Sequence, residues 1–143
     1  MNCARRLVSI VALAGLCTAA HAFAAKSALR FDGFYRFNVP TNVGAMTSYL
    51  RFYPDGVVVA TTTPGTLRDV TKWLNREQKP NYHYSVRGNS IQFTEDTNGA
   101  SSYAYSGTIG PDSLSLRVDG YDHKQSMGYV QRTYKFVHVD FSR

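Results

Sequence analysis

Apolar and polar residues alternate in short runs over most of this chain, and turn residues end each run. Alternation with a period of two is typical of β-strands that bury one face. The pattern predicts eight strands, and almost all of them are joined by short loops. Their approximate ranges are 30–39, 49–53, 57–61, 82–87, 90–94, 103–109, 113–118 and 128–139.

Three of the predicted connections carry a hairpin signal. Asp55-Gly56, Gly88-Asn89 and the segment 110–112 each stand between two alternating runs. Glycine adopts the positive φ that a tight turn requires, so these positions favour hairpins between adjacent antiparallel strands.

One segment has a different period. Between residues 63 and 75 the apolar side chains of Leu67, Val70, Trp73 and Leu74 recur at helical spacing. Thr66 and Asp69 have the spacing of a capping box, which marks a helix start. We therefore expect one short amphipathic helix between the third and fourth strands.

Eight sequential antiparallel strands favour an all-β, up-and-down barrel. Closure leaves no unpaired strand edge, which suits a small domain without disulfides. A sandwich of two sheets would satisfy the same alternation, and the sequence leaves that alternative open.

Alternation also assigns an interior. The inward set is apolar and unusually aromatic, and comprises Phe31, Tyr35, Phe37, Leu50, Phe52, Tyr82, Tyr84, Val86, Ile91, Phe93, Tyr103, Tyr105, Leu114, Leu116, Val118, Val130, Tyr134 and Phe136. A buried tyrosine hydroxyl needs a hydrogen-bond partner, whereas phenylalanine would fill the same volume without one. Two interpretations stay open: a packed core, or a cavity for a small amphipathic ligand that the tyrosines line. Arg132 falls on the inward side of the last strand, where a guanidinium needs a partner or an aromatic ring.

The first residues have the form of a signal peptide. Arg5 and Arg6 precede an apolar run over residues 7–20, and cleavage is expected after Ala22 or Ala24. The run has about 14 residues, whereas roughly 20 are needed to span a bilayer, so we expect no transmembrane segment after cleavage. A lipid anchor at Cys17 is disfavoured because the preceding residue, Leu16, is large. The prediction is a periplasmic or secreted protein with a single domain over residues 23–143.

Cleavage changes the composition of the chain. Both cysteines, Cys3 and Cys17, leave with the signal peptide, so core packing alone must stabilise the domain. Removing Arg5 and Arg6 lowers the net charge from +6 to +4. The remaining basic residues are scattered, whereas a nucleic-acid binder concentrates them on one face. We expect no nucleic-acid partner.

No motif for catalysis or metal binding emerges from the sequence. The histidines of the predicted domain, His83, His123 and His138, lack metal-ligand spacing, and no serine occurs in a Gly-x-Ser-x-Gly elbow. The sequence therefore predicts neither an enzyme nor a cofactor.

Gly33-Phe34-Tyr35 on the first strand and Arg132-Thr133-Tyr134 on the last resemble the calycin superfamily, which includes the lipocalins. In that superfamily a Gly-x-aromatic motif packs against a basic residue of the final strand and closes one barrel end. Tyr35 stands here where the family usually has tryptophan, and Arg132 would be its partner.

The resemblance implies that an apolar or amphipathic molecule binds inside the barrel. The ligand-binding residues would be Tyr35, Tyr82, Tyr84, Tyr103, Tyr105, Arg132 and Tyr134. Alternatively, the chain is an inhibitor or immunity protein that contacts a protein partner in the cell envelope through its loops. The loops 98–102 and 119–127, with Tyr121, His123 and Met127, would then form the contact. A purely structural role in the envelope is the third possibility.

Overall fold

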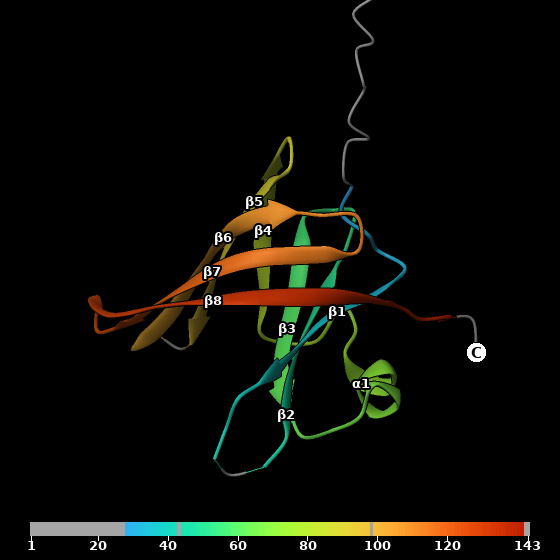
Figure 1. Ribbon diagram of the computed structural model, residues 1–143, viewed down its shortest axis with the longest axis horizontal. Coiled ribbons are helices and arrows are strands. Elements are labelled where there is room, and N and C mark those ends of the chain that lie inside the picture. The colour runs from blue at the N-terminus through green and yellow to red at the C-terminus, as the bar shows by residue number, and fades with distance from the viewer. Residues whose placement is uncertain (1–27, 43, 98, 142–143) are drawn as a thin grey trace, which may run out of the picture.

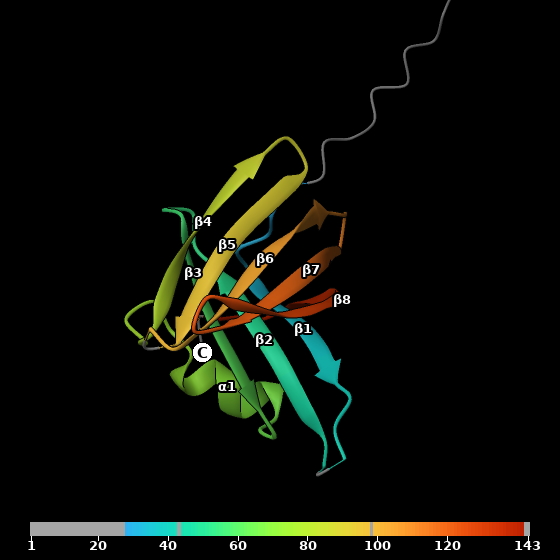
Figure 2. The same ribbon diagram turned by 90° about the vertical axis from the view of Figure 1, so that its left-hand side faces the viewer.

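The chain folds into a closed barrel of eight antiparallel strands in sequence order, so the sandwich alternative is excluded (Figures 1 and 2). The computed structural model describes residues 28–42, 44–97 and 99–141, and the predicted signal peptide lies outside them. The elements are β1 (Gly33–Val39), β2 (Met46–Phe52), β3 (Val57–Thr63), α1 (Leu67–Trp73), β4 (Asn81–Arg87), β5 (Ser90–Thr97), β6 (Ser101–Ile109), β7 (Ser113–Asp122) and β8 (Gln125–His138).

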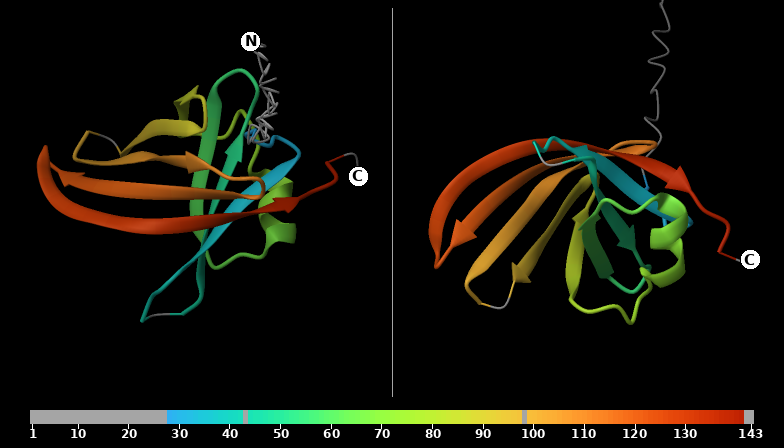
Figure 3. Two further views of the ribbon diagram at one scale, coloured as in Figure 1. Left: turned by 45° about the horizontal axis from the view of Figure 1, so that its top comes forward. Right: turned by 90° about the horizontal axis from the view of Figure 1, so that it is seen from below.

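The barrel closes where the first strand meets the last. β1 pairs with β8 from Gly33 opposite His138 to Arg36 opposite Lys135, and this ladder then ends. Glycine is required at the start of this seam, because a Cβ at Gly33 would lie 2.1 Å from the carbonyl oxygen of Val137. Beyond the seam β7 and β8 continue together as a long hairpin that projects past β1 (Figures 1 and 3).

The barrel interior is filled along most of its length. The buried inward side chains are Tyr35, Leu50, Phe52, Val58, Tyr82, Ile91, Phe93, Tyr105, Ile109, Leu114, Leu116, Val118 and Tyr134. Most of the predicted inward set is therefore correct. Three members are wrong as core residues, because Phe31, Val86 and Val130 are 39%, 41% and 49% exposed. Each lies at the margin of the barrel: Phe31 precedes β1, Val86 lies beside the β4–β5 turn, and Val130 lies on the projecting hairpin.

The predicted helix is confirmed and covers the outside of the barrel. Thr66 is its N-cap, and Thr66 and Asp69 form the expected capping box. Val70 and Leu74 are fully buried, in a cluster with Phe34, Tyr49 and Val59 on the outer face of β1–β3.

Arg51 lies in this second, outer cluster. Its guanidinium lies 3.7 Å from the centre of the Phe141 ring and donates to the carbonyl of Leu74. Trp73, which shares the helical apolar pattern, is 39% exposed. The sheet therefore has a second apolar face here, although Arg51 occupies a position that alternation assigns to the solvent.

The three predicted hairpins are confirmed, but the loop expected over residues 119–127 is wrong. β7 extends to Asp122 and β8 begins at Gln125, so the turn consists of His123 and Lys124. Both have positive φ, 46° and 69°, as a type I′ turn requires. Met127 is the extra residue of a bulge, because Gly120 pairs with Gly128 and Tyr121 with Ser126.

Candidate functional site

The two ends of the barrel differ. One end, called the closed end below, holds residues 28–32 and the β2–β3, β4–β5 and β6–β7 turns; the other, called the open end, holds the β1–β2, β5–β6 and β7–β8 connections. The tyrosines expected to bind a ligand are divided between these ends by their hydroxyl partners. The hydroxyl of Tyr35 accepts a hydrogen bond from the backbone N–H of Arg30, and that of Tyr84 donates to the carbonyl of Tyr53. Tyr35 and Tyr84 therefore belong to the closed end.

Arg30 covers the aromatic side chains at the closed end. Its guanidinium lies 3.9 Å from the centre of the Phe136 ring and forms ion pairs of 2.8 and 2.9 Å with Asp32 and Asp112. The hydrogen bonds from Arg30 lower the pKa of Asp32 to about 2. Ion pairing at this end thus ties the segment before β1 to the β6–β7 turn.

Arg132, the partner that the sequence predicted for Tyr35, lies elsewhere in the barrel. Tyr35 packs edge-on against Phe52 and Phe136, and the basic residue at its hydroxyl is Arg30. Arg132 is four residues before Phe136 on β8, so it lies nearer the open end. The expected pairing of Arg132 with Tyr35 is therefore replaced by an arginine from the N-terminal segment.

The open end carries a group of polar side chains that point inward. Tyr134 and Ser48 share a hydrogen bond of 3.1 Å, and the Tyr105 hydroxyl donates to the Glu95 carboxylate at 2.9 Å. The Tyr82 hydroxyl is buried and has no protein hydrogen-bond partner in the described part of the chain. Hydroxyl groups on four strands, β2, β4, β6 and β8, thus face the same end of the interior.

Burial and nearby carboxylates raise the pKa of two of these phenols, Tyr82 and Tyr105. Burial raises the pKa of Tyr82 to about 12, and the charges of Glu95 and Asp96 add to the rise. The pKa of Tyr105 is raised for the same main reason, burial, with a further contribution from Glu95. Tyr82 and Tyr105 therefore act as neutral hydrogen-bonding groups.

A hollow of about 210 Å³ opens beside this group, between β6, β7 and β8. It is lined by Tyr103, Val118, Gly120, Met127, Gly128, Tyr129, Val130 and Arg132. A Cβ at Gly120 would lie 3.4 Å from the Met127 methyl and 3.5 Å from the Tyr103 ring. The hollow is mainly apolar, and Arg132 is its only charged lining residue.

Arg132 has few partners. Its guanidinium lies 5.6 Å from the centre of the Phe37 ring, and Nη1 donates to the Tyr134 hydroxyl at 3.5 Å. Within residues 28–42, 44–97 and 99–141, no carboxylate lies within ion-pairing distance of it. A half-buried guanidinium without a carboxylate is a potential anion-binding group.

The structure adds two residues to the open end that the sequence did not assign to a site, Glu95 and Ser48. Glu95 continues the inward series of Ile91 and Phe93, so its position on the alternating pattern was the available signal. Ser48 likewise continues the inward series of Leu50 and Phe52, but it lies before the start of the predicted strand at residue 49.

The residues expected in a protein contact all lie on the β7–β8 hairpin. His123 is in the turn, Tyr121 is half-buried on β7, and Met127 is 56% exposed at the bulge. The backbone N–H of His123 donates to the carbonyl of Ala100, which links this turn to the β5–β6 turn.

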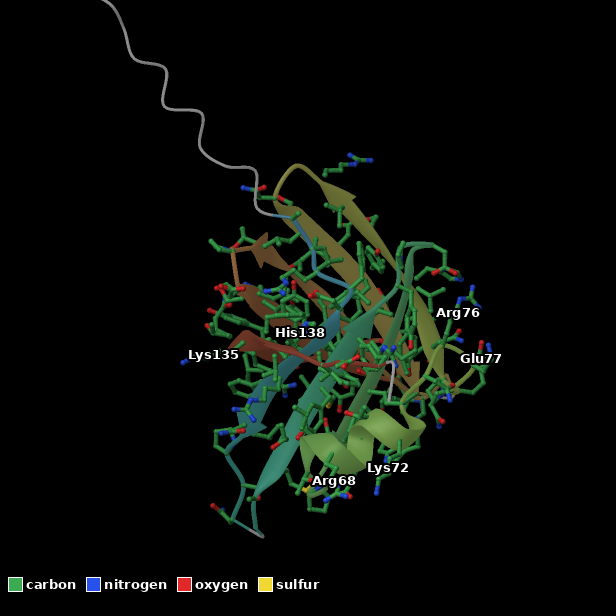
Figure 4. All side chains as sticks on the ribbon, turned by 90° about the vertical axis from the view of Figure 1, so that its right-hand side faces the viewer. Arg68, Lys72, Arg76, Glu77, Lys135 and His138 are labelled. Carbon is green, nitrogen blue, oxygen red and sulfur yellow. The ribbon has the colours of Figure 1, made fainter. Side chains whose placement is uncertain are left out.

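A second hollow, of about 700 Å³, lies between α1 and the C-terminal segment, and Leu67, Lys72 and Val139 are among its lining residues. Arg68 and Lys72 project from the helix and His138 lies at the end of β8 (Figure 4). The His138 ring is already hydrogen-bonded to Asp32 at 3.0 Å.

Comparisons with family models, with curated proteins and with solved structures each found no match. No helix among the described residues is long and apolar enough to cross a membrane. The same residues contain no group of three or more metal-ligating side chains.

Proposed function

We propose that this chain is an exported, non-enzymatic binding protein that holds a small amphipathic molecule at the open end of a lipocalin-like barrel. The observation that carries the proposal is Arg132, a guanidinium without a carboxylate at the edge of an apolar hollow. The anionic end of the ligand would pair with Arg132. Its apolar part would lie against Tyr103, Met127 and Val130.

The filled interior limits the size and depth of the proposed ligand. Tyr35, Phe52, Leu114 and Leu116 are at most 1% exposed, so the closed half of the barrel has no room for a long chain. The Phe93 and Tyr105 rings stack with their centres 4.4 Å apart, directly below the open end. The ligand would therefore sit in the mouth rather than along the axis.

The proposal predicts that a charge-removing substitution at Arg132 weakens anion binding. The probe is 1-anilinonaphthalene-8-sulfonate, an amphipathic anion whose fluorescence rises on binding. Arg132→Met keeps the length of the side chain and removes the charge, and we expect about tenfold weaker binding because a charge-assisted hydrogen bond is lost.

Lys135→Met is the matched control, since Lys135 is an exposed cation on the same strand outside the hollow (Figure 4). Equal affinities of the two variants would contradict the proposal. Thermal unfolding of each variant separates loss of binding from loss of fold. Native mass spectrometry of the protein from its own host then shows whether a small-molecule adduct co-purifies.

A protein contact through the β7–β8 hairpin is the second candidate function. The segment 127–130 of this hairpin contains three large apolar residues. Met127, Tyr129 and Val130 are 56%, 56% and 49% exposed. Large apolar residues that gather on one exposed element are typical of a binding surface.

A further inference from the structure

The first half of β8 has a partner on one side only. It pairs with β7 from Asp122 opposite Gln125 onward, whereas its ladder with β1 begins only at Lys135. Figure 3 shows β8 as the outer strand along this stretch, with no other strand on the side away from β7.

The orientation of the backbone groups on this edge follows from two hydrogen bonds. The N–H of Phe136 donates to Asp112 on the β7 side, and the N–H of Val139 donates to Asp32 on the β1 side. Because the direction alternates along a strand, the N–H and C=O groups of Tyr129, Gln131 and Thr133 point away from β7. In the described part of the chain, no strand pairs with them.

The side chains beside this edge define the chemistry of what could pair with it. Met127 and Val130 offer apolar surface, and the half-exposed Tyr129 ring has the Arg117 guanidinium 3.7 Å from its centre. Between residues 123 and 135 the chain contains Lys124, Arg132, Lys135 and one histidine, and no aspartate or glutamate. Arg36 on β1 lies opposite Lys135 and adds to the positive charge. On β7, Asp122 lies opposite Gln125, and Asp119 lies opposite Tyr129 but is paired with Arg117.

We propose that the free edge of β8 binds an extended, acidic segment of a partner protein, which adds to the sheet as a further strand. Unpaired N–H and C=O groups in strand geometry are complementary to another extended backbone. Apolar side chains of the segment would contact Tyr129 or Val130, and its carboxylates would pair with Arg132 or Lys135. This inference rests on the second candidate function above.

The first arm of the test uses a synthetic probe and a proline substitution. The probe is a fluorescein-labelled eight-residue peptide of alternating glutamate and valine, and binding to the full chain is followed by fluorescence anisotropy. Gln131→Pro removes an N–H that points out of the edge and leaves the β7 ladder intact, as proline is tolerated on edge strands. We expect at least about tenfold weaker binding.

Gln131→Ala is the matched control, because it truncates the same side chain and keeps the N–H; its affinity should stay within about twofold of wild type. Thr133→Pro repeats the test at the next outward-pointing N–H in case Gln131→Pro fails to fold. A lysine–valine peptide of the same length should bind much more weakly than the acidic one.

Each of the other outcomes would contradict one part of the proposal. If Gln131→Pro binds like wild type while Met127→Ser weakens binding, strand addition is wrong and contact through the hairpin side chains stands. If the lysine–valine peptide binds equally well, the acidic partner is wrong. If the acidic peptide does not bind at all, the inference fails, and so does an acidic partner for the hairpin.

Discussion

Individual tyrosines in this barrel combine two requirements, because each fills core volume and each hydroxyl must be satisfied. Tyr35 shows both: its side chain is fully buried, packs edge-on against Phe52 and Phe136, and accepts a hydrogen bond from Arg30. Burial raises the pKa of its hydroxyl. A residue of this kind stabilises the fold mainly through its ring.

Tyr35→Ala should therefore lower the free energy of unfolding by roughly 3 kcal/mol, as aromatic truncations in cores do. Tyr35→Phe keeps the ring and loses only the hydrogen bond, so we expect a loss of about 1 kcal/mol. Urea denaturation followed by circular dichroism measures both. A wild-type midpoint for Tyr35→Ala would mean that the ring contributes nothing to the core.

The sequence correctly predicts which residues point inward where apolar and polar positions alternate without interruption. It fails where another segment of the chain covers the outer face of the sheet. The phase of β5 correctly places Ile91 and Phe93 inside. Arg51 is polar on an outward position, and no local pattern shows that α1 and Phe141 cover it. Arg30 lies before the first strand, so only the folded chain brings it to Tyr35.

At the scale of elements, the helix was predictable from its cap, and the length of the last hairpin was not. Thr66 and Asp69 mark the start of α1 in sequence as they do in the structure. Asp119, Gly120 and Gly128 are typical turn residues, yet they pair within β7 and β8 because a bulge accommodates Met127. A pattern of turn residues cannot reveal that a twisted, bulged hairpin continues through them.

The capping box gives a prediction at this scale. Thr66→Ala removes the side-chain acceptor for the Asp69 N–H and should destabilise the protein by about 1 kcal/mol. Thr66→Ser keeps the hydroxyl and should stay close to wild type. The thermal unfolding midpoint is the measurement, and equal midpoints for the alanine and serine variants would show that the cap is dispensable.

At the scale of the whole molecule, the short β1–β8 seam determines whether the barrel is closed. Four residue pairs join the two strands. Gly33 lies at one end of this ladder, where the carbonyl of Val137 and the ring of Phe136 leave no space for a methyl group.

Gly33→Ala should therefore force the seam apart and cost about 2 kcal/mol of stability. Gly120→Ala is the control on another strand, because its Cβ would meet its neighbours at 3.4 Å or more. Hydrogen exchange of the β1 and β8 amides measures opening of the seam directly. Unchanged protection in Gly33→Ala would show that the backbone can shift there without cost.

The position of the seam also has a consequence in time. Residues 33–36 and 135–138, which close the barrel, lie about 100 residues apart, and all the other strands stand between them in the chain. Each intermediate strand can pair with its sequence neighbour first, while one edge of β1 stays unpaired until β8 has folded against it. An unpaired strand edge is a template for association with other chains. The folding chain is therefore most in need of protection before β8 pairs with β1.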